Sequence, residues 1–86
     1  MDLSKEQRNI LQQFGANLRR LRVAAGLTQA KLAELADVEL RTEQKWERGV
    51  INPPLTTLVR IQFVLKCEWN ELIGDLRGQS ARKHNN

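Results

Sequence analysis

The chain has 86 residues, of which 41% are hydrophobic and 28% are charged, and this size and composition are typical of one small globular domain. The single cysteine, Cys67, cannot form a disulfide within the chain and is typical of a protein from a reducing cytoplasm. No apolar run approaches the roughly 20 residues that cross a bilayer, and the first residues lack a signal-peptide pattern, so we expect no membrane partner. Fourteen basic against ten acidic residues permit a polyanionic partner but do not require one.

The first predicted helix starts near Lys5, because Ser4 and Gln7 have the spacing of a capping box. Gly26 ends this helix. Gly15 lies inside it at a cost in helix propensity, which we attribute to another backbone that passes close by. The apolar residues of this helix recur every three or four positions and predict a buried stripe of Leu11, Phe14, Leu18, Leu21 and Ala25.

Two short helices joined by a tight turn are predicted between Thr28 and Gly49. Thr28 can cap the first of them, and Asp37-Val38 forms the turn. The second helix runs from about Glu39 to Arg48, and Gly49 stops it because glycine adopts the left-handed conformation without strain. The apolar face of the first helix comprises Leu32, Ala33, Leu35 and Ala36. A pair of this size cannot bury its own inner faces, so it must pack against the flanking helices.

After this pair, Pro53 and Pro54 predict an extended loop. A fourth helix is predicted from about Leu55 to Lys66, and a fifth from about Trp69 to Asp75. Residues 77–86 are polar and basic and predict a disordered tail, so the domain is expected to span residues 1–76. The apolar residues expected to face the core from the last two helices are Leu58, Ile61, Leu65, Trp69, Leu72 and Ile73.

Residues spread over five elements of the chain share a specific joint spacing: Gly26-Leu27-Thr28-Gln29, Leu32-Ala33, Val38, Trp46-Glu47-Arg48-Gly49, Asn52-Pro53, Leu58, Ile61, Leu65 and Leu72. At these residues the chain resembles the phage-repressor-like helix-turn-helix proteins of the Cro/XRE type, over residues 14–73. The resemblance implies an all-α fold class, namely a compact five-helix lambda-repressor-like DNA-binding domain with the helix-turn-helix at helices 2 and 3. It also implies a cytoplasmic protein of bacterial or phage origin.

The resemblance further implies that the third helix, about residues 39–48, enters the major groove of double-stranded DNA. It directs Leu40, Arg41, Gln44 and Lys45 toward the bases, and helical geometry places them on one face. Arg41 can bind guanine through two hydrogen bonds, Lys45 can reach the same atoms, and Gln44 can pair with adenine. Leu40 can contact a thymine methyl group or belong to the core. The alternative for all four is a solvated helix face.

Phosphate contacts are expected from Gln29, because it starts a helix whose free N–H groups attract anions. Thr42, Asn52 and Arg19 are weaker candidates, and a cation near a helix C-terminus such as Arg19 is also explained by the helix dipole. In the family, the position of Arg22 pairs with that of Glu47. The guanidinium and the carboxylate would form a two-bond fork that fixes the angle between the first and third helices.

The chain departs from the family pattern at three positions, Glu43, Gln62 and Phe63. Gln62 stands where the family prefers a small apolar residue. Glu43 stands where the family has an apolar residue packed between the two helices, and an unpaired buried carboxylate is costly. Either Glu43 finds a basic partner such as Lys31, or the third helix is rotated so that Leu40 fills the gap. Phe63 stands where a polar residue is usual, which indicates a rotated fourth helix or a contact with the first helix or a second subunit.

No other chemistry stands out. His84 lacks metal-ligand partners at useful spacing, so we expect no metal and no cofactor. Nothing orients a Cys67–His84 pair for catalysis, so we interpret Cys67 as a small buried hydrophobe and the protein as a non-enzyme. Trp46 and Trp69 are expected in the core rather than as platforms for stacked bases. No small-molecule ligand is evident.

The function expected is that of a sequence-specific transcriptional regulator, a repressor acting as a homodimer, since one short helix reads only a few base pairs. An antitoxin or a restriction-modification controller that autoregulates its operon is the nearest variant. The alternative from another class is a protein-interaction module that kept the fold without DNA binding. Glu43 and the zero net charge of the third helix favour that module, whereas Arg41, Lys45 and Gln29 favour a regulator.

Overall fold

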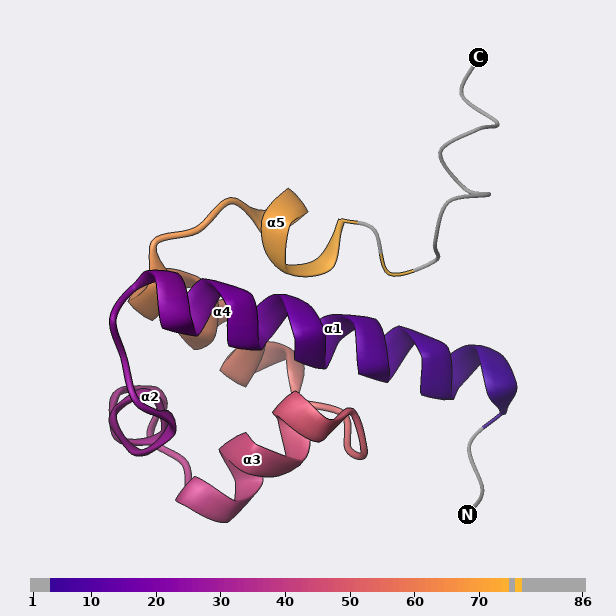
Figure 1. Ribbon diagram of the computed structural model, residues 1–86, viewed down its shortest axis with the longest axis horizontal. Coiled ribbons are helices and arrows are strands. Elements are labelled where there is room, and N and C mark those ends of the chain that lie inside the picture. The colour runs from indigo at the N-terminus through magenta and orange to yellow at the C-terminus, as the bar shows by residue number, and fades with distance from the viewer. Residues whose placement is uncertain (1–3, 75, 77–86) are drawn as a thin grey trace.

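A computed structural model describes residues 4–74 and 76 of the chain. In this described part the secondary structure is helical, with α1 (Lys5–Ala24), α2 (Gln29–Ala36), α3 (Leu40–Arg48), α4 (Leu55–Leu65) and α5 (Trp69–Ile73). In Figure 1, α2 and α3 lie on one side of the long α1, and α5 lies on the other. The predicted all-α fold is confirmed, and the helices begin at or next to their predicted first residues. The expected tail, 77–86, and the expected end of the fifth helix lie outside the described residues.

Capping interactions explain where the helices start and stop. The Ser4 hydroxyl accepts a hydrogen bond from the backbone N–H of Gln7 at 3.1 Å, and the Gln7 side chain accepts one from the Ser4 N–H at 2.9 Å. Thr28 caps α2 with a single hydrogen bond, which its hydroxyl accepts from the Lys31 backbone N–H at 3.0 Å. Asp37 and Gly49 end α2 and α3 in the left-handed conformation, with φ of 61° and 75°. The predicted turn between the two helices is therefore formed.

The core joins one face of α1 to the other helices and contains Phe14, Leu18, Leu32, Ala36, Trp46, Ile61, Cys67 and Leu72. Asn17 is buried with them, and its Nδ2 donates to the Leu72 carbonyl at 3.0 Å, which ties α1 to α5. Three residues expected on buried faces are exposed, namely Ala25, Trp69 and Leu35, which is 39% exposed. Ala25 is exposed because it caps α1 beyond the turns that pack. Trp69 is 40% exposed, and it begins a helix of only five residues.

The crossing of α1 and α3 is unusually close, and Gly15 allows it. A Cβ atom at Gly15 would lie 2.5 Å from the carbonyl oxygen of Trp46 and 2.6 Å from that of Glu47. These are backbone atoms, which cannot turn aside as a flexible side chain can. The expectation that another backbone passes close to Gly15 is therefore confirmed. The contact fixes how far α3 stands from the bundle.

No helix in the described part of the chain is long and apolar enough to cross a membrane.

Candidate nucleic-acid interface

The charged residues of α3 are sorted between its two faces. The side chains of Glu43 and Glu47 are only 0% and 4% exposed, and both face α1. Arg41 and Arg48 are exposed, and Lys45 is half-buried. The net charge of the helix, which is zero when residues 39–48 are counted along the sequence, therefore does not describe its surface. Apart from the glutamate at its N-cap, α3 presents basic groups outward.

The four predicted base-contact residues lie on this outward side. Leu40 is 42% exposed and Arg41 is exposed, so the first turn of α3 stands clear of the bundle. Gln44 and Lys45 follow one turn later and are half-buried. The interpretation of Leu40 as a core residue is wrong. Their role as base contacts remains a prediction, but each of the four has access to a ligand.

Arg22 holds α3 against α1 through a two-bond fork. Its Nε donates to Glu47 Oε2 at 2.6 Å, and its Nη2 donates to Glu47 Oε1 at 3.2 Å. The remaining terminal nitrogen donates to the Leu27 carbonyl at 2.8 Å, at the entry to α2. The hydrogen bond to Glu47 raises the pKa of Arg22 above its ordinary value. One buried guanidinium thus links α1, the start of the helix-turn-helix and α3.

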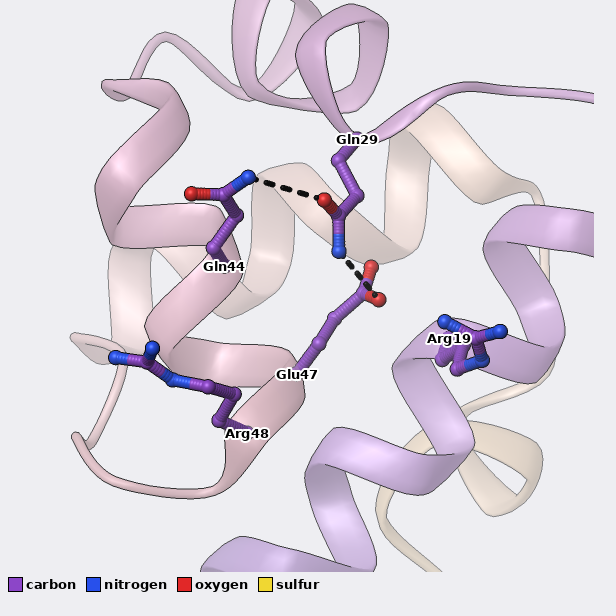
Figure 2. Close-up of a pocket in the computed structure, with 5 residues that line it drawn as sticks. All are labelled: Arg19, Gln29, Gln44, Glu47 and Arg48. Atoms are coloured by element: carbon purple, nitrogen blue, oxygen red, sulfur yellow. Dashed lines mark hydrogen bonds between the residues drawn. The ribbon is translucent and has the colours of Figure 1, made fainter.

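The hydrogen bonds continue from this fork to the outer surface. Gln29, the first residue of α2, donates from Nε2 to Glu47 Oε1 at 3.1 Å. Its own Oε1 accepts a hydrogen bond from Gln44 Nε2 at 3.2 Å, as Figure 2 shows. A predicted phosphate contact and a predicted base contact are therefore joined to each other. Burial raises the pKa of Glu47, but the contacts of its carboxylate, among them the hydrogen bonds from Arg22 and Gln29, outweigh burial and hold this pKa below its ordinary value.

Glu43 has a basic partner, as the first of the two expected courses has it, but that partner is Arg22 and not Lys31. Lys31 pairs with Glu34 at 3.4 Å instead, and the exposed Leu40 does not fill the site. Glu43 itself is fully buried, with Oε2 3.9 Å from Nε of Arg22, the guanidinium that Glu47 already occupies. Burial, and then the neighbouring Glu47, raise the pKa of Glu43 to about 8. The basic partner of Glu43 is thus a shared one.

A pocket of about 370 Å³ opens between α1, α2 and α3. Figure 2 shows Gln29, Gln44 and Glu47 within it, with Arg19 of α1 on one side and Arg48 of α3 on the other. Two guanidinium groups beside the N-terminus of α2 suit an anionic ligand. Arg48 was not predicted as a contact, although its spacing of four residues from Gln44 places it on the same face. The predicted contacts Thr42 and Asn52 do not line this pocket.

Comparisons with known proteins agree with this geometry. A family model described as a helix-turn-helix domain matches residues 13–65. The chain belongs to the helix-turn-helix family. Among solved structures, this helix-turn-helix protein is similar to the restriction-modification controller protein C.AhdI from Aeromonas hydrophila, with 32% identity and a TM-score of 0.72, over 80% of this chain and 99% of that chain. It is also similar to the clp gene regulator ClgR from Corynebacterium glutamicum, with 25% identity and a TM-score of 0.71, over 88% of this chain and 85% of that one. No curated protein matches the chain.

The resemblance identified from the sequence is thereby confirmed, both in family and in fold. The described residues also bear on a metal site and on the chemistry of Cys67. They contain no group of three or more histidine, cysteine or acidic residues that could hold a metal ion. Cys67 is buried as predicted, and that burial raises the pKa of its thiol, which keeps it protonated. His84, its suggested partner, lies outside the described residues.

Proposed function

We propose that this helix-turn-helix protein is a sequence-specific transcriptional regulator that inserts α3 into the major groove of double-stranded DNA. The sorting of charges on α3 carries this proposal. Glu43 and Glu47 turn inward to Arg22, which leaves Arg41, Lys45 and Arg48 to face a polyanion. The zero net charge of residues 39–48 therefore no longer favours a protein-interaction module, because two of the three acidic residues in this range are buried.

Each exposed group of α3 has a chemistry that suits part of the duplex. Arg41 can donate two hydrogen bonds to guanine O6 and N7, and Lys45 can reach the same edge. Gln44 donates one amide hydrogen to Gln29, so its carbonyl oxygen and its second amide hydrogen stay available for a base. Leu40 offers an apolar contact for a thymine methyl group. Arg19, Gln29 and Arg48 would hold a phosphate at the pocket, which sets the register of α3 on the DNA.

Binding to duplex DNA of random sequence tests the proposal. We expect a complex at micromolar protein in low salt, and a linear fall of log affinity with log salt concentration as counterions return to the phosphates. Fluorescence anisotropy of a labelled duplex measures both. Absence of any complex in low salt would favour the protein-interaction module. Selection from a pool of random oligonucleotides then yields the preferred sequence.

Within the selected sequence, Arg41→Ala is expected to remove discrimination at one base position. The loss should be about 1–3 kcal/mol of preference for the correct base, the range of a bidentate arginine–guanine contact. Lys5→Ala is a suitable control. It also removes one positive charge, but Lys5 is exposed at the far end of α1 and not on α3. Equal losses in the two variants, on all sequences alike, would mean that Arg41 contributes charge and reads no base.

We further propose that the protein binds as a homodimer whose two α3 helices contact half-sites roughly 34 Å apart, and that it represses by excluding other proteins from that DNA. Leu55, Val59 and Phe63 recur every four residues on α4 and are 74%, 51% and 77% exposed. Of the roles considered for Phe63, a contact with a second subunit is the one that its exposure favours.

Phe63→Glu is expected to yield a folded monomer. The side chain is 77% exposed, so a charge costs the isolated domain little, whereas a charge buried in an apolar interface is expensive. Sedimentation equilibrium of the wild type and the variant measures the change, and circular dichroism confirms the fold. Glu34→Gln, an exposed change on α2, is the control. A wild type that stays monomeric at all concentrations, with or without DNA, would contradict the homodimer.

Among the possible kinds of regulator, we propose a restriction-modification controller, because one comparison favours it. The match to C.AhdI covers 99% of that chain, so the whole of that controller corresponds to a domain of this kind. Under this variant the protein would regulate its own operon. Binding to DNA immediately upstream of its own coding sequence, compared with unrelated promoters of equal length, tests it.

A further inference from the structure

Glu43 is a buried acid of α3, and the proposed contacts of this helix with DNA do not involve it. It is fully buried, and neither of its side-chain oxygens accepts a hydrogen bond from a donor in the described part of the chain. Its Oε2 lies 3.9 Å from Nε of Arg22, whereas Glu47 Oε2 lies 2.6 Å from the same atom. One guanidinium therefore stands between two carboxyl groups and is hydrogen-bonded to only one of them.

We infer that Glu43 is a positioning residue that keeps its proton in the folded protein and donates it in a hydrogen bond to Glu47. An ionised Glu43 would be a buried charge without a hydrogen-bond donor, beside a second carboxylate and a cation that is already engaged. A protonated Glu43 leaves one positive and one negative charge in the cluster. It also supplies the donor that two adjacent carboxylates otherwise lack.

The charged groups placed against Glu43 are Arg22 from α1 and Glu47 from its own helix, while α2 adds the neutral Gln29 to the same cluster. Burial and the negative charge of Glu47 favour the neutral acid, and Arg22 opposes them. The balance raises the pKa of Glu43 to about 8. The proton is thus retained at neutral pH.

Glu43 would act on the outer surface through Glu47. Glu47 Oε1 accepts from Gln29, and Gln29 in turn accepts from Gln44, at 3.1 and 3.2 Å. The proton on Glu43 therefore helps to set the carboxylate that orients the two glutamines of the pocket. This last step rests on the proposed DNA-binding function, but the protonation of Glu43 does not.

Nuclear magnetic resonance of the full chain, with glutamate side chains labelled with ¹³C, tests the proton directly. The signal absent from Glu43→Gln belongs to Glu43. We expect that signal at the position of a protonated carboxyl group at pH 6, with a titration midpoint near 8. A signal already ionised at pH 6, with an ordinary midpoint, would overturn the inference.

The stability of the fold supplies a second readout. Because the folded state retains a proton that the unfolded state releases near pH 4.5, the folding equilibrium constant should fall about tenfold per pH unit between about pH 5 and 8. Urea unfolding at several pH values measures this slope. Glu43→Gln should remove the slope while keeping a donor for Glu47, and Glu43→Ala should be less stable than Glu43→Gln because it lacks that donor.

Glu34→Gln controls for a change of net charge, since the Glu34 side chain is 70% exposed, and it should leave the slope unchanged. Equal slopes in wild type and Glu43→Gln would overturn the inference. Should Glu43→Gln fail to fold, the wild-type titration still decides, because a labelled glutamate with a midpoint near 8 must be present.

The link from Glu43 to DNA binding is tested separately. We expect wild-type affinity for random duplex to fall from pH 7 to pH 9 more than that of Glu43→Gln, and equal falls would refute the link to Gln44. Absence of binding at every pH would refute the proposed function instead.

Discussion

Replacement of Arg22 by alanine should destabilise the domain by about 3–5 kcal/mol, the usual cost of removing one partner from a buried ion pair. The truncation leaves Glu47 without its fork and takes away the cation beside Glu43, while the Leu27 carbonyl loses a donor. Small domains are stable by roughly 5–15 kcal/mol, so the variant should be partly unfolded at 37 °C. Thermal and urea unfolding followed by circular dichroism measures the loss.

The dependence of this loss on pH identifies its origin. The low pKa of Glu47 in the wild type contributes stability that is present above about pH 4.5 and is lost as the pH falls through the lower folded value. In Arg22→Ala that contribution is smaller, because only the contacts other than Arg22 remain, so the difference in stability between the two proteins should shrink toward pH 3. Arg20→Ala is the control, because the exposed Arg20 bonds only to Asn17 and a backbone carbonyl among the described residues. An unchanged melting temperature in Arg22→Ala would show that the fork is dispensable.

Most of the fold could be predicted because its signals are local. Capping residues such as Ser4 and Thr28 determine where helices begin, and the spacing of apolar residues identifies the buried side of α1. The errors arose where burial depends on neighbours. Trp69 has the large apolar side chain of a typical core residue, yet it lies on a helix of only five residues and stays 40% exposed. Periodicity indicates which side of a helix is apolar, but not how far the contact with the next helix extends.

The candidate site was predictable in outline and not in its connections. Helical spacing places Arg41 and Lys45 on one outward face, as the structure has them. The path from Glu47 through Gln29 to Gln44 joins positions 18 and 15 residues apart, and it depends on the crossing of α2 and α3 and on side-chain rotamers. Glu43 was recognised as a departure from the family, but not its position beside Arg22. That position follows from the distance between α1 and α3.

That distance is set by Gly15, and the second large effect is expected there. At an ordinary position inside a helix, alanine in place of glycine gains up to about 1 kcal/mol in helix propensity. At Gly15 the added Cβ would lie 2.5 Å from the Trp46 carbonyl oxygen and 2.6 Å from that of Glu47, so α1 and α3 must separate. We expect Gly15→Ala to cost about 3 kcal/mol, at the upper end of the usual cost of overpacking.

We place the cost of Gly15→Ala at the upper end of that range because separating α1 from α3 also stretches the fork between Arg22 and Glu47, whose shorter hydrogen bond is 2.6 Å. Urea unfolding measures the cost, and Ala16→Gly calibrates it, because Ala16 is exposed one residue further along the same helix and should lose only about 1 kcal/mol. The two substitutions are opposite in sense, so propensity alone predicts opposite signs. If both variants are less stable than the wild type, the close approach of α3 outweighs the propensity of α1. A Gly15→Ala protein that is more stable than the wild type would mean that α3 can move away without loss, and that its position relative to α1 is not fixed by this contact.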